Sequence, residues 1–285
     1  MCVTLRPASL SKTIIYAGDA YHPTTMDYVH VLAYQNRALN KDPKPNAMIL
    51  PIPSAEPLEK KNTIDLTGYG NALKDIGHPV TNMRADRPNG EASFGRPGPV
   101  SIFRTGSYTV AIASEAGEVA AALATLPGDI RPQLNREIFK FYGEYYKGWP
   151  IAICCWAKAI KPEPLMWWYK PKTPKRIFFP MLDAHNGKAP NTRKDPKRDH
   201  LLLMGSRVKP FGVLHQATDL GPAEDFIPER VWGRDLQGAD FNRDYVVDIG
   251  AMRVIQNSQG PYDLHARLDP KIWSLNFDYI MPGEV

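Results

Sequence analysis

The sequence predicts an α+β protein that is rich in β-strands, with mostly antiparallel sheets and two central helices. Apolar runs of the strand type occur along most of the chain, and only two segments have helical spacing. The two helical segments stand together between two groups of strands, which is not the alternation of a parallel α/β fold. Proline, with 27 of 285 residues, is unusually frequent and predicts short elements joined by rigid loops.

The expected strands are runs of alternating or continuous apolar residues. They are TIIYAG, DYVHVLAY, NAMILPIP, SIFRTGSYTVAIAS, WPIAICCWAKAI, PLMWWYKP, RIFFPML, HLLLMGS and DYVVDIGAMRVI. In NAMILPIP, Pro51 and Pro53 lack backbone donors at alternate positions. That strand should therefore lie at a sheet edge or leave the sheet there.

The two expected helices span about 115–126 and 133–147. Ser114 is the expected cap of the first helix, and Gly148 follows the second. The apolar stripes are Val119, Leu123 and Leu126 in the first helix and Leu134, Ile138, Phe141 and Tyr145 in the second.

The chain is expected to form a single domain over residues 1–285. Asn, Asp, Gly and Pro cluster in NMRADRPNGEASFGRPGPV, where a functional loop, a lid or a domain boundary would fit. The alternative division is therefore an N-terminal β subdomain over 1–95 and an α+β subdomain over 96–285.

The composition favours a cytoplasmic protein without a membrane span. No run approaches the ~18 apolar residues that a span needs, and the first residues do not resemble a secretory signal. Three cysteines cannot all pair, so free thiols in a reducing compartment are expected. Cys154 and Cys155 are expected to be buried and structural, because the run IAICCWA is apolar on both faces.

The positive charge is concentrated in one segment. Residues 170–198 hold nine Lys or Arg against two Asp, whereas the whole chain has a formal net charge of only +5. This segment is either a patch for phosphates or an acidic partner, or a solvated loop. It lacks the aromatic spacing of a stacking platform, which argues against nucleic acid as the partner.

A candidate binding site lies where aromatic residues meet this basic segment. Trp167 and Trp168 are adjacent, so on a strand only one of them can enter a given core face. The other would lie beside Lys172, Lys175 and Arg176 as a contact surface for a protein partner or a second copy of the chain.

The first eighty or so residues resemble an uncharacterised family of secreted bacterial proteins. The resemblance rests on a cysteine near the start, the segments KTIIYAG and VHVLAYQN, and the Leu-Pro-x-Pro of NAMILPIPS before GNALKDIG. This chain has Ala47 and Met48 where the family has an aromatic residue and Trp, and it lacks a signal peptide. The resemblance implies a β-rich N-terminal half and no particular activity.

The first twenty residues also resemble cysteine-type N-terminal nucleophile hydrolases. Cys2 follows Met1, and CVTLRP, a Pro-Ala-Ser turn and TIIYAGDAY have the family's hairpin layout. The resemblance implies that Cys2, once Met1 is removed, is the nucleophile, with its α-amine as base and with Arg6 and Asp19 as positioning groups. The family's Gly-Arg-Asn run is absent.

A divalent metal site is the third candidate. Asp183 and His185 stand two residues apart, a spacing that puts both on one face of a strand, and His200 follows further along. No established metal-binding spacing is matched, so we expect neither a metal nor another cofactor. The residues therefore favour a binding or assembly protein, with an amidohydrolase that uses Cys2 as the alternative and a metal-dependent hydrolase third.

Overall fold

The fold is described from a computed structural model. The described residues are 2–81, 102–157, 163–210, 212–215, 217, 219–240, 242–249 and 277–279. The sequence segment considered above as a loop or boundary, 82–100, lies outside them.

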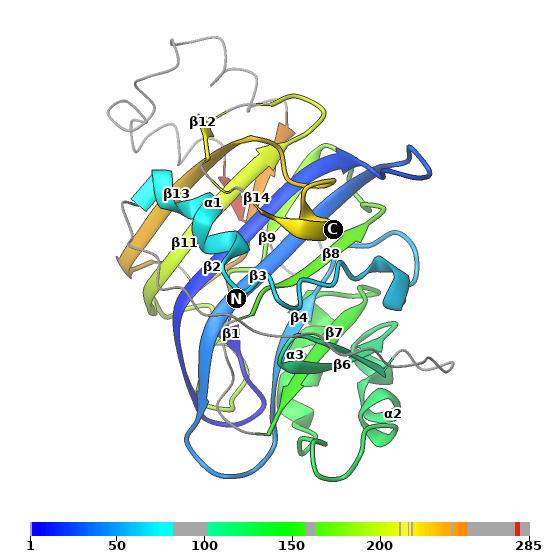
Figure 1. The fold of residues 1–285 in the computed structure, drawn as a ribbon. Helices are drawn as coiled ribbons and strands as arrows, with labels where there is room; N and C mark the ends of the chain where they lie inside the picture. The colour runs from blue at the N-terminus through cyan, green and yellow to red at the C-terminus, as the bar shows by residue number, and fades with distance from the viewer. Residues whose placement is uncertain are drawn as a thin grey trace.

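The central element is a six-stranded sheet in the order β12-β13-β11-β2-β3-β8, seen from one face in Figure 1. Its strands are β2 (Ala8–Tyr21), β3 (Tyr28–Asn40), β8 (Leu165–Tyr169), β11 (Lys197–Ser206), β12 (Val213–Leu214) and β13 (Arg230–Ala239). All neighbouring strands are antiparallel except β2 and β11, which are parallel.

Three smaller sheets complete the described strands. A four-stranded antiparallel sheet has the order β4-β7-β6-β5, a three-stranded sheet has the order β15-β14-β9, and β1 pairs with β10 in parallel. The bounds are β1 (Cys2–Val3), β4 (Asn46–Pro51), β5 (Ile102–Thr105), β6 (Tyr108–Ala113), β7 (Ile151–Trp156), β9 (Arg176–Phe179), β10 (Asp183–Ala184), β14 (Tyr245–Asp248) and β15 (Phe277–Tyr279). The predicted fold class, β-rich α+β with mostly antiparallel sheets, is confirmed.

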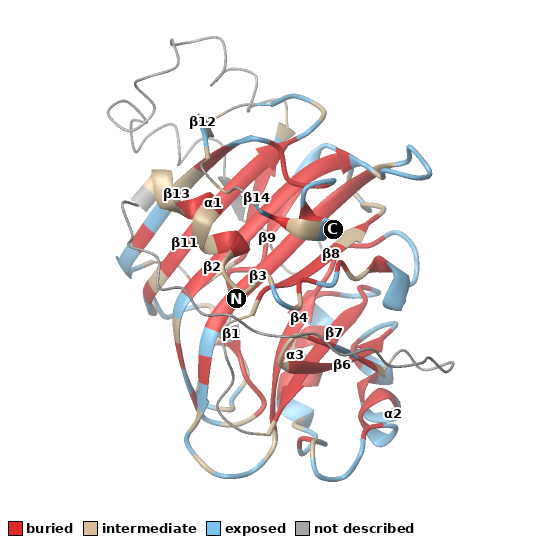
Figure 2. Ribbon diagram, in the orientation of Figure 1, coloured by how far each residue is buried: buried red, intermediate tan, exposed pale blue. Residues whose placement is uncertain are grey.

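The central strands β2 and β3 are buried on both faces, as Figure 2 shows by the red colour along them. Successive residues of β2 contribute to two different cores: Ile14 and Tyr16 belong to one, and Ile15 and Ala17 to the other. This follows from the alternation of side chains along a strand. The sheet thus has packed layers on both sides.

Three α-helices and three short 3₁₀ helices are present in the described part. They are α1 (Ala72–Thr81), α2 (Val119–Ala124), α3 (Arg136–Tyr145), η1 (Lys60–Asn62), η2 (Ala116–Glu118) and η3 (Gly221–Ala223). The two expected helices are therefore present as η2 with α2 and as α3. Their buried stripes are largely those expected, although Leu134 precedes α3 and is exposed.

The predicted cap of the first helix is wrong, and α1 and β13 were not predicted from the sequence. Ser114 is exposed, and η2 follows Glu115, whose side chain makes no capping hydrogen bond. Helix α1 lies against β11 and β13 and approaches them closely at Gly77, where a Cβ would stand 2.6 Å from a methyl carbon of Leu201. This close approach is how α1 covers one face of the large sheet.

The edge position expected for the segment with Pro51 and Pro53 is confirmed. Strand β4 is the first strand of its sheet and ends at Pro51. Residues 4 and 5 pair with part of its outer edge: Thr4 forms a β-bridge with Met48, and the amide of Leu5 donates to the carbonyl of Ala47 (3.0 Å).

Cys154 and Cys155 lie on the central strand β7 and are both buried, as expected from the run IAICCWA. Burial raises the pKa of both thiols, that of Cys155 to about 12. We therefore predict that iodoacetamide modifies neither of them in the native protein at pH 8, because the thiolate is the reactive form. Peptide mass mapping before and after denaturation checks this, and fast native labelling of either cysteine would contradict it.

Candidate functional site

The turn between β2 and β3 displays two large apolar side chains at one end of the central sheet. Tyr21 is 47% exposed, and Met26, at 66%, has the highest exposure of the large apolar side chains in the described part of the chain. The tip is the exposed hairpin at the upper right of Figures 1 and 2. Two exposed large apolar side chains at one turn make this turn a candidate contact site.

The turn is held rigidly by its own hydrogen bonds. The amide of His22 donates to the carbonyl of Asp27 (2.8 Å), and the amide of Met26 donates to the carbonyl of His22 (2.9 Å). The amides of Thr24 and Thr25 both donate to Nδ1 of His22 (3.3 Å each). The exposed residues therefore project from an ordered turn.

Met26 adopts a left-handed backbone conformation, with φ of 57°. Residues with a Cβ avoid this region, and a bulky residue there stores strain of the order of 1 kcal/mol. Glycine or asparagine would fit the turn with less strain. A long apolar side chain is thus displayed at a position that the backbone alone would not select.

The segment between β8 and β9 lies against this turn. The hydroxyl of Tyr28 lies 3.1 Å from the carbonyl of Pro174, and Nε2 of His30 lies 3.2 Å from the same oxygen. Nζ of Lys170 forms ion pairs with Asp27 (3.5 Å) and with a second carboxylate from the segment after β4. These contacts fix the 170–176 segment, whose Lys172, Lys175 and Arg176 are exposed.

A buried carboxyl lies beneath the same turn. Asp19 is 1% exposed and accepts a hydrogen bond from the hydroxyl of Tyr28 (3.0 Å), which is also 3.3 Å from Nε2 of His30. Burial raises the pKa of Asp19, and burial lowers the pKa of His30 to about 4. His30 is therefore uncharged at neutral pH, and the positive charges near the β2–β3 turn come from lysine and arginine side chains.

The two adjacent tryptophans divide between the two faces of the sheet, as the sequence predicted. Trp167 is fully buried in the larger core. Trp168 is half-buried on the opposite face; its ring lies 4.5 Å from that of His22, and its Nε1 donates to the carbonyl of Lys61 (3.0 Å). Trp168 thus packs under the β2–β3 turn on the face opposite to Tyr28 and the 170–176 segment, so the structure does not bring it together with the cations of that segment, and Trp167 is a core residue.

The basic segment does not form one patch. Lys172, Lys175 and Arg176 follow β8, whose last residue pairs with His30 near the β2–β3 turn. Of the other exposed cations, Lys188, Arg193 and Lys194 precede β11 and Lys197 is its first residue; His200 of β11 pairs with Thr13, toward the opposite end of β2. Arg198 is buried, and its guanidinium donates to the carbonyl of Met181 (2.6 Å).

The residues proposed for an N-terminal nucleophile are not brought together. Asp19 pairs with His30 at one end of β2, whereas Arg6 precedes the other end, roughly 35 Å away at ~3.3 Å per strand residue. The Arg6 guanidinium forms an ion pair with Asp42 (2.5 Å). Cys2 instead lies in register with Asp183, because β1 pairs with β10.

Asp183 and His185 do meet, as their spacing suggested. Nε2 of His185 lies 2.5 Å from Oδ1 of Asp183, a carboxylate that is almost fully buried. His200 is also buried, and burial is the main reason why its pKa lies well below the ordinary histidine value. Among the described side chains, the charges of Arg198 and His185 lower this pKa further. Within the described ranges no group of three His, Cys, Asp or Glu residues has the geometry to hold a metal ion.

For the metal we predict that the purified protein carries less than about 0.1 equivalent of any divalent ion and that EDTA leaves its melting temperature unchanged. A ligand that binds only the native state would stabilise it, so chelation would lower the melting temperature if a structural metal were present. Elemental analysis and calorimetry check this. One equivalent of zinc or manganese, with a lower melting temperature after chelation, would restore the metal-dependent hydrolase.

The exposed side chains of the β2–β3 turn were not predicted from the sequence. Tyr21 and Met26 flank the segment HPTT, and no feature of the sequence distinguishes these two residues from strand residues of the core. The only signal was the HPTTMD stretch itself, whose Pro, Thr and Asp are typical of a turn. We call the set formed by Tyr21, Met26, Lys172, Lys175 and Arg176 the hairpin-end surface; Trp168 lies on the other face of the sheet and is not part of it.

Comparisons with known proteins leave this chain without an assigned family. No family model matches it, and no curated protein matches it. Among solved structures it is similar to baculovirus P35, with 13% sequence identity, 87% of this chain and 91% of that chain covered, and a TM-score of 0.41. That score is too low to carry either the fold or a function across. No helix in the described ranges has the length and apolar character that crossing a membrane requires.

Proposed function

We propose that this chain is a cytoplasmic binding protein whose hairpin-end surface contacts a protein partner that carries acidic groups. The observation that carries the proposal is the display of Tyr21 and Met26 on a strained turn, where Tyr28, which packs against Tyr21, contacts the segment that holds three exposed cations. Apolar anchors inside a charged rim are the usual composition of a protein contact site. The free thiols of Cys154 and Cys155 support the reducing compartment.

The rigidity of the surface also supports binding. The ring of Tyr21 packs edge-on against that of Tyr28 (6.2 Å between centroids), and Tyr28 is tied to the 170–176 segment. A contact site that is ordered before binding loses less conformational entropy when the partner docks. The partner would then place acidic side chains on Lys172, Lys175 and Arg176 and apolar ones against Met26.

Site-specific photo-crosslinking tests the proposal. With p-benzoylphenylalanine in place of Tyr21, we expect irradiation in cells to give one dominant adduct with a protein partner. The matched control carries the same group in place of Leu134, which is 36% exposed and lies just before α3, away from this turn. Equal adduct patterns at both positions, or no adduct at position 21, would contradict the proposed surface.

As a second candidate we propose a cysteine-dependent acyl-transfer activity in which Cys2 is the nucleophile. The specific observation is the pairing of β1 with β10, which puts Cys2 in register with Asp183, whose Oδ1 lies 2.5 Å from Nε2 of His185. Where a thiol, an imidazole and a carboxylate stand together, the imidazole can accept the thiol proton and the carboxylate can orient the ring. This differs from the N-terminal hydrolase mechanism because it does not use the α-amine.

We predict for this candidate that iodoacetamide alkylates Cys2 fast at pH 7 and that His185→Gln slows the reaction about tenfold, because only the thiolate reacts. His22→Gln is the control, since His22 lies at the β2–β3 turn. Equal alkylation rates in all three proteins would remove the candidate. The intact mass separates the two cysteine mechanisms, because retained Met1 excludes only the one that needs the α-amine.

A further inference from the structure

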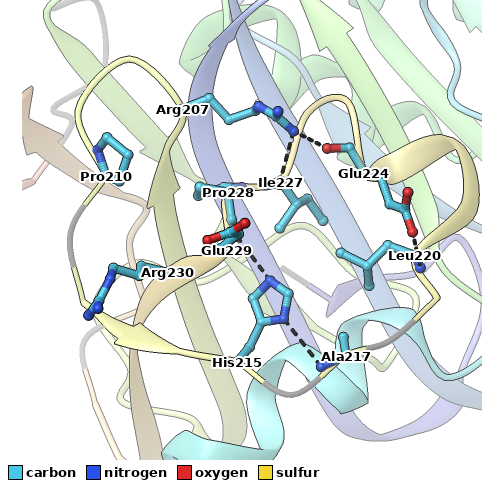
Figure 3. Close-up of a pocket in the computed structure, with 10 residues that line it drawn as sticks. All are labelled: Arg207, Pro210, His215, Ala217, Leu220, Glu224, Ile227, Pro228, Glu229 and Arg230. Carbon is cyan, nitrogen blue, oxygen red and sulfur yellow. Dashed lines mark hydrogen bonds between the residues drawn. The ribbon is translucent and has the colours of Figure 1, made fainter.

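A cavity of about 500 Å³ opens beside the end of β11 and has no part in the functions proposed above. It is formed by the residue after β11, the segment around η3 and the start of β13 (Figure 3). Its lining residues are Arg207, Pro210, His215, Ala217, Leu220, Glu224, Ile227, Pro228, Glu229 and Arg230. This volume suits a small organic molecule or one side chain of a larger ligand.

The cavity has an apolar floor. Leu220 and Ile227 are 4% and 3% exposed, and Figure 3 shows both side chains in the middle of the lining. Pro228 is also buried, and Ala217 stands beside them. A ligand that fills the cavity therefore needs an apolar body to displace water from this floor.

One guanidinium is fixed at the wall without a carboxylate. Arg207 donates through one nitrogen, Nη1, to the carbonyls of Glu224 and Ile227, the latter at 3.4 Å. None of the ion pairs among the described residues includes Arg207. Oε1 of Glu224 instead accepts the amide of Leu220 (3.3 Å). Neutral carbonyls orient this cation, so its charge is left for a ligand.

The histidine of the cavity is not a second cation. Nε2 of His215 lies 2.9 Å from the carbonyl of Pro228, and its Nδ1 accepts the amide of Ala217 (3.3 Å). This pairing requires the neutral ring with its proton on Nε2. Burial lowers the pKa of His215, in agreement with that state.

The rim carries charges of both signs. Glu229 and Arg230 are exposed neighbours at the start of β13, and the guanidinium of Arg230 points away from the floor in Figure 3. Nη1 of Arg230 is 3.4 Å from the carbonyl of Gly212. The carboxylates of Glu224 and Glu229, which both line the cavity, would repel a ligand with several negative charges. The cavity therefore suits a single negative group.

We propose that this cavity binds a monocarboxylate with a small branched or aromatic apolar body. The carboxylate would accept hydrogen bonds from those N–H groups of Arg207 that do not bond to the two backbone carbonyls. The apolar body would lie on Leu220 and Ile227. Such a carboxylate comes either from a free organic acid or from the C-terminus of a peptide. Both sources present the same chemistry to Arg207.

The test is an NMR titration of the ¹⁵N-labelled full chain with phenylacetate. We expect saturable shifts of the Ala217, Leu220 and Glu224 amides. Phenylacetamide, which has the same shape without the charge, and acetate, which lacks the apolar body, should each bind about tenfold more weakly. Acetyl-Gly-Gly-Phe serves as the peptide source: tighter binding than phenylacetate assigns the site to chain ends, and weaker binding assigns it to free acids.

Variants separate the cavity from non-specific anion binding. Arg207→Gln should weaken phenylacetate binding about tenfold, whereas Arg193→Gln, at the other end of the sheet, should leave it unchanged. The comparison of phenylacetate with phenylacetamide uses the unaltered protein, so it holds even if Arg207→Gln destabilises the fold. Equal affinities for the acid and the amide, or an unchanged affinity in Arg207→Gln, would overturn the proposal.

Discussion

Asp244→Ala should destabilise the protein by about 4 kcal/mol, because the substitution leaves three buried donors without an acceptor. Asp244 is 0% exposed, and Oδ1 accepts the amides of Met181 (2.6 Å) and Leu182 (2.9 Å). Oδ2 accepts the hydroxyl of Tyr146, a residue that is also fully buried. This carboxyl joins the segment after β9 to the residues that follow α3.

Two further variants make this result specific to the hydrogen bonds. Asp244→Asn keeps one oxygen for the two amides and should cost less than half as much, and Tyr146→Phe should cost about 1–2 kcal/mol. Urea unfolding at pH 7 measures all three. If Asp244→Ala costs no more than Tyr146→Phe, the buried network contributes little to stability.

The same carboxyl gives an expected pH dependence. Burial raises the pKa of Asp244 above its ordinary value, in spite of the hydrogen bonds that lower it. Its contribution to stability is therefore complete below the unfolded value of about 3.9 and is lost as the pH rises through the higher native value. In Asp244→Asn this part of the pH profile should be flat.

Met26→Gly should lower the adduct yield of a photo-crosslinker at position 21 at least about fivefold while it leaves the fold intact or stabilises it by about 1 kcal/mol. The side chain at the turn is removed, and glycine adopts the left-handed conformation without strain. Loss of contact together with gain of stability is the result expected for a residue retained for binding.

Lys12→Gly is the matched control. Lys12 has φ of 55° and is, with Met26, one of the two non-glycine residues with positive φ in the described part of the chain. It lies at the bulge of β2, at the end remote from the turn. This variant should relieve similar strain without any change in adduct yield. A fall in both variants would show that the adduct reports backbone flexibility and not the Met26 side chain.

The sequence predicted those features that depend on local periodicity. A run that is apolar on both faces correctly predicted that Cys154 and Cys155 lie in a central strand. Because neighbouring strand residues face opposite sides, the sequence also predicted that Trp167 and Trp168 lie on different faces of the sheet. Strand β13 was missed because its outward positions are charged and its two glycines interrupt the apolar pattern. This segment forms a strand because it pairs with β11, a tertiary contact that its own sequence does not indicate.

The candidate site could be predicted only in part. Adjacent residues suggested Trp168 with Lys172, Lys175 and Arg176, but the separation of these cations from Arg193 depends on the pairing of β8 with β3 and of β11 with β2. The left-handed Met26 and the pairing of Cys2 with Asp183 arise from tertiary contacts. No pattern of period 2 or 3.6 carries such information.

The most direct test of the proposed binding surface reverses its charges and compares the result with an equal reversal elsewhere. Lys172, Lys175 and Arg176 are changed together to Glu in one protein, and Lys188, Arg193 and Lys194 in another. All six side chains are exposed, so both proteins should melt close to the unaltered one.

The quantity measured is the yield of the position-21 adduct in 0.05 M and 0.5 M salt. We predict that the yield falls at least about fivefold in the first protein only, and that high salt lowers the yield of the unaltered protein in the same direction. Equal yields in both reversed proteins at either salt concentration would contradict the hairpin-end surface as the contact site.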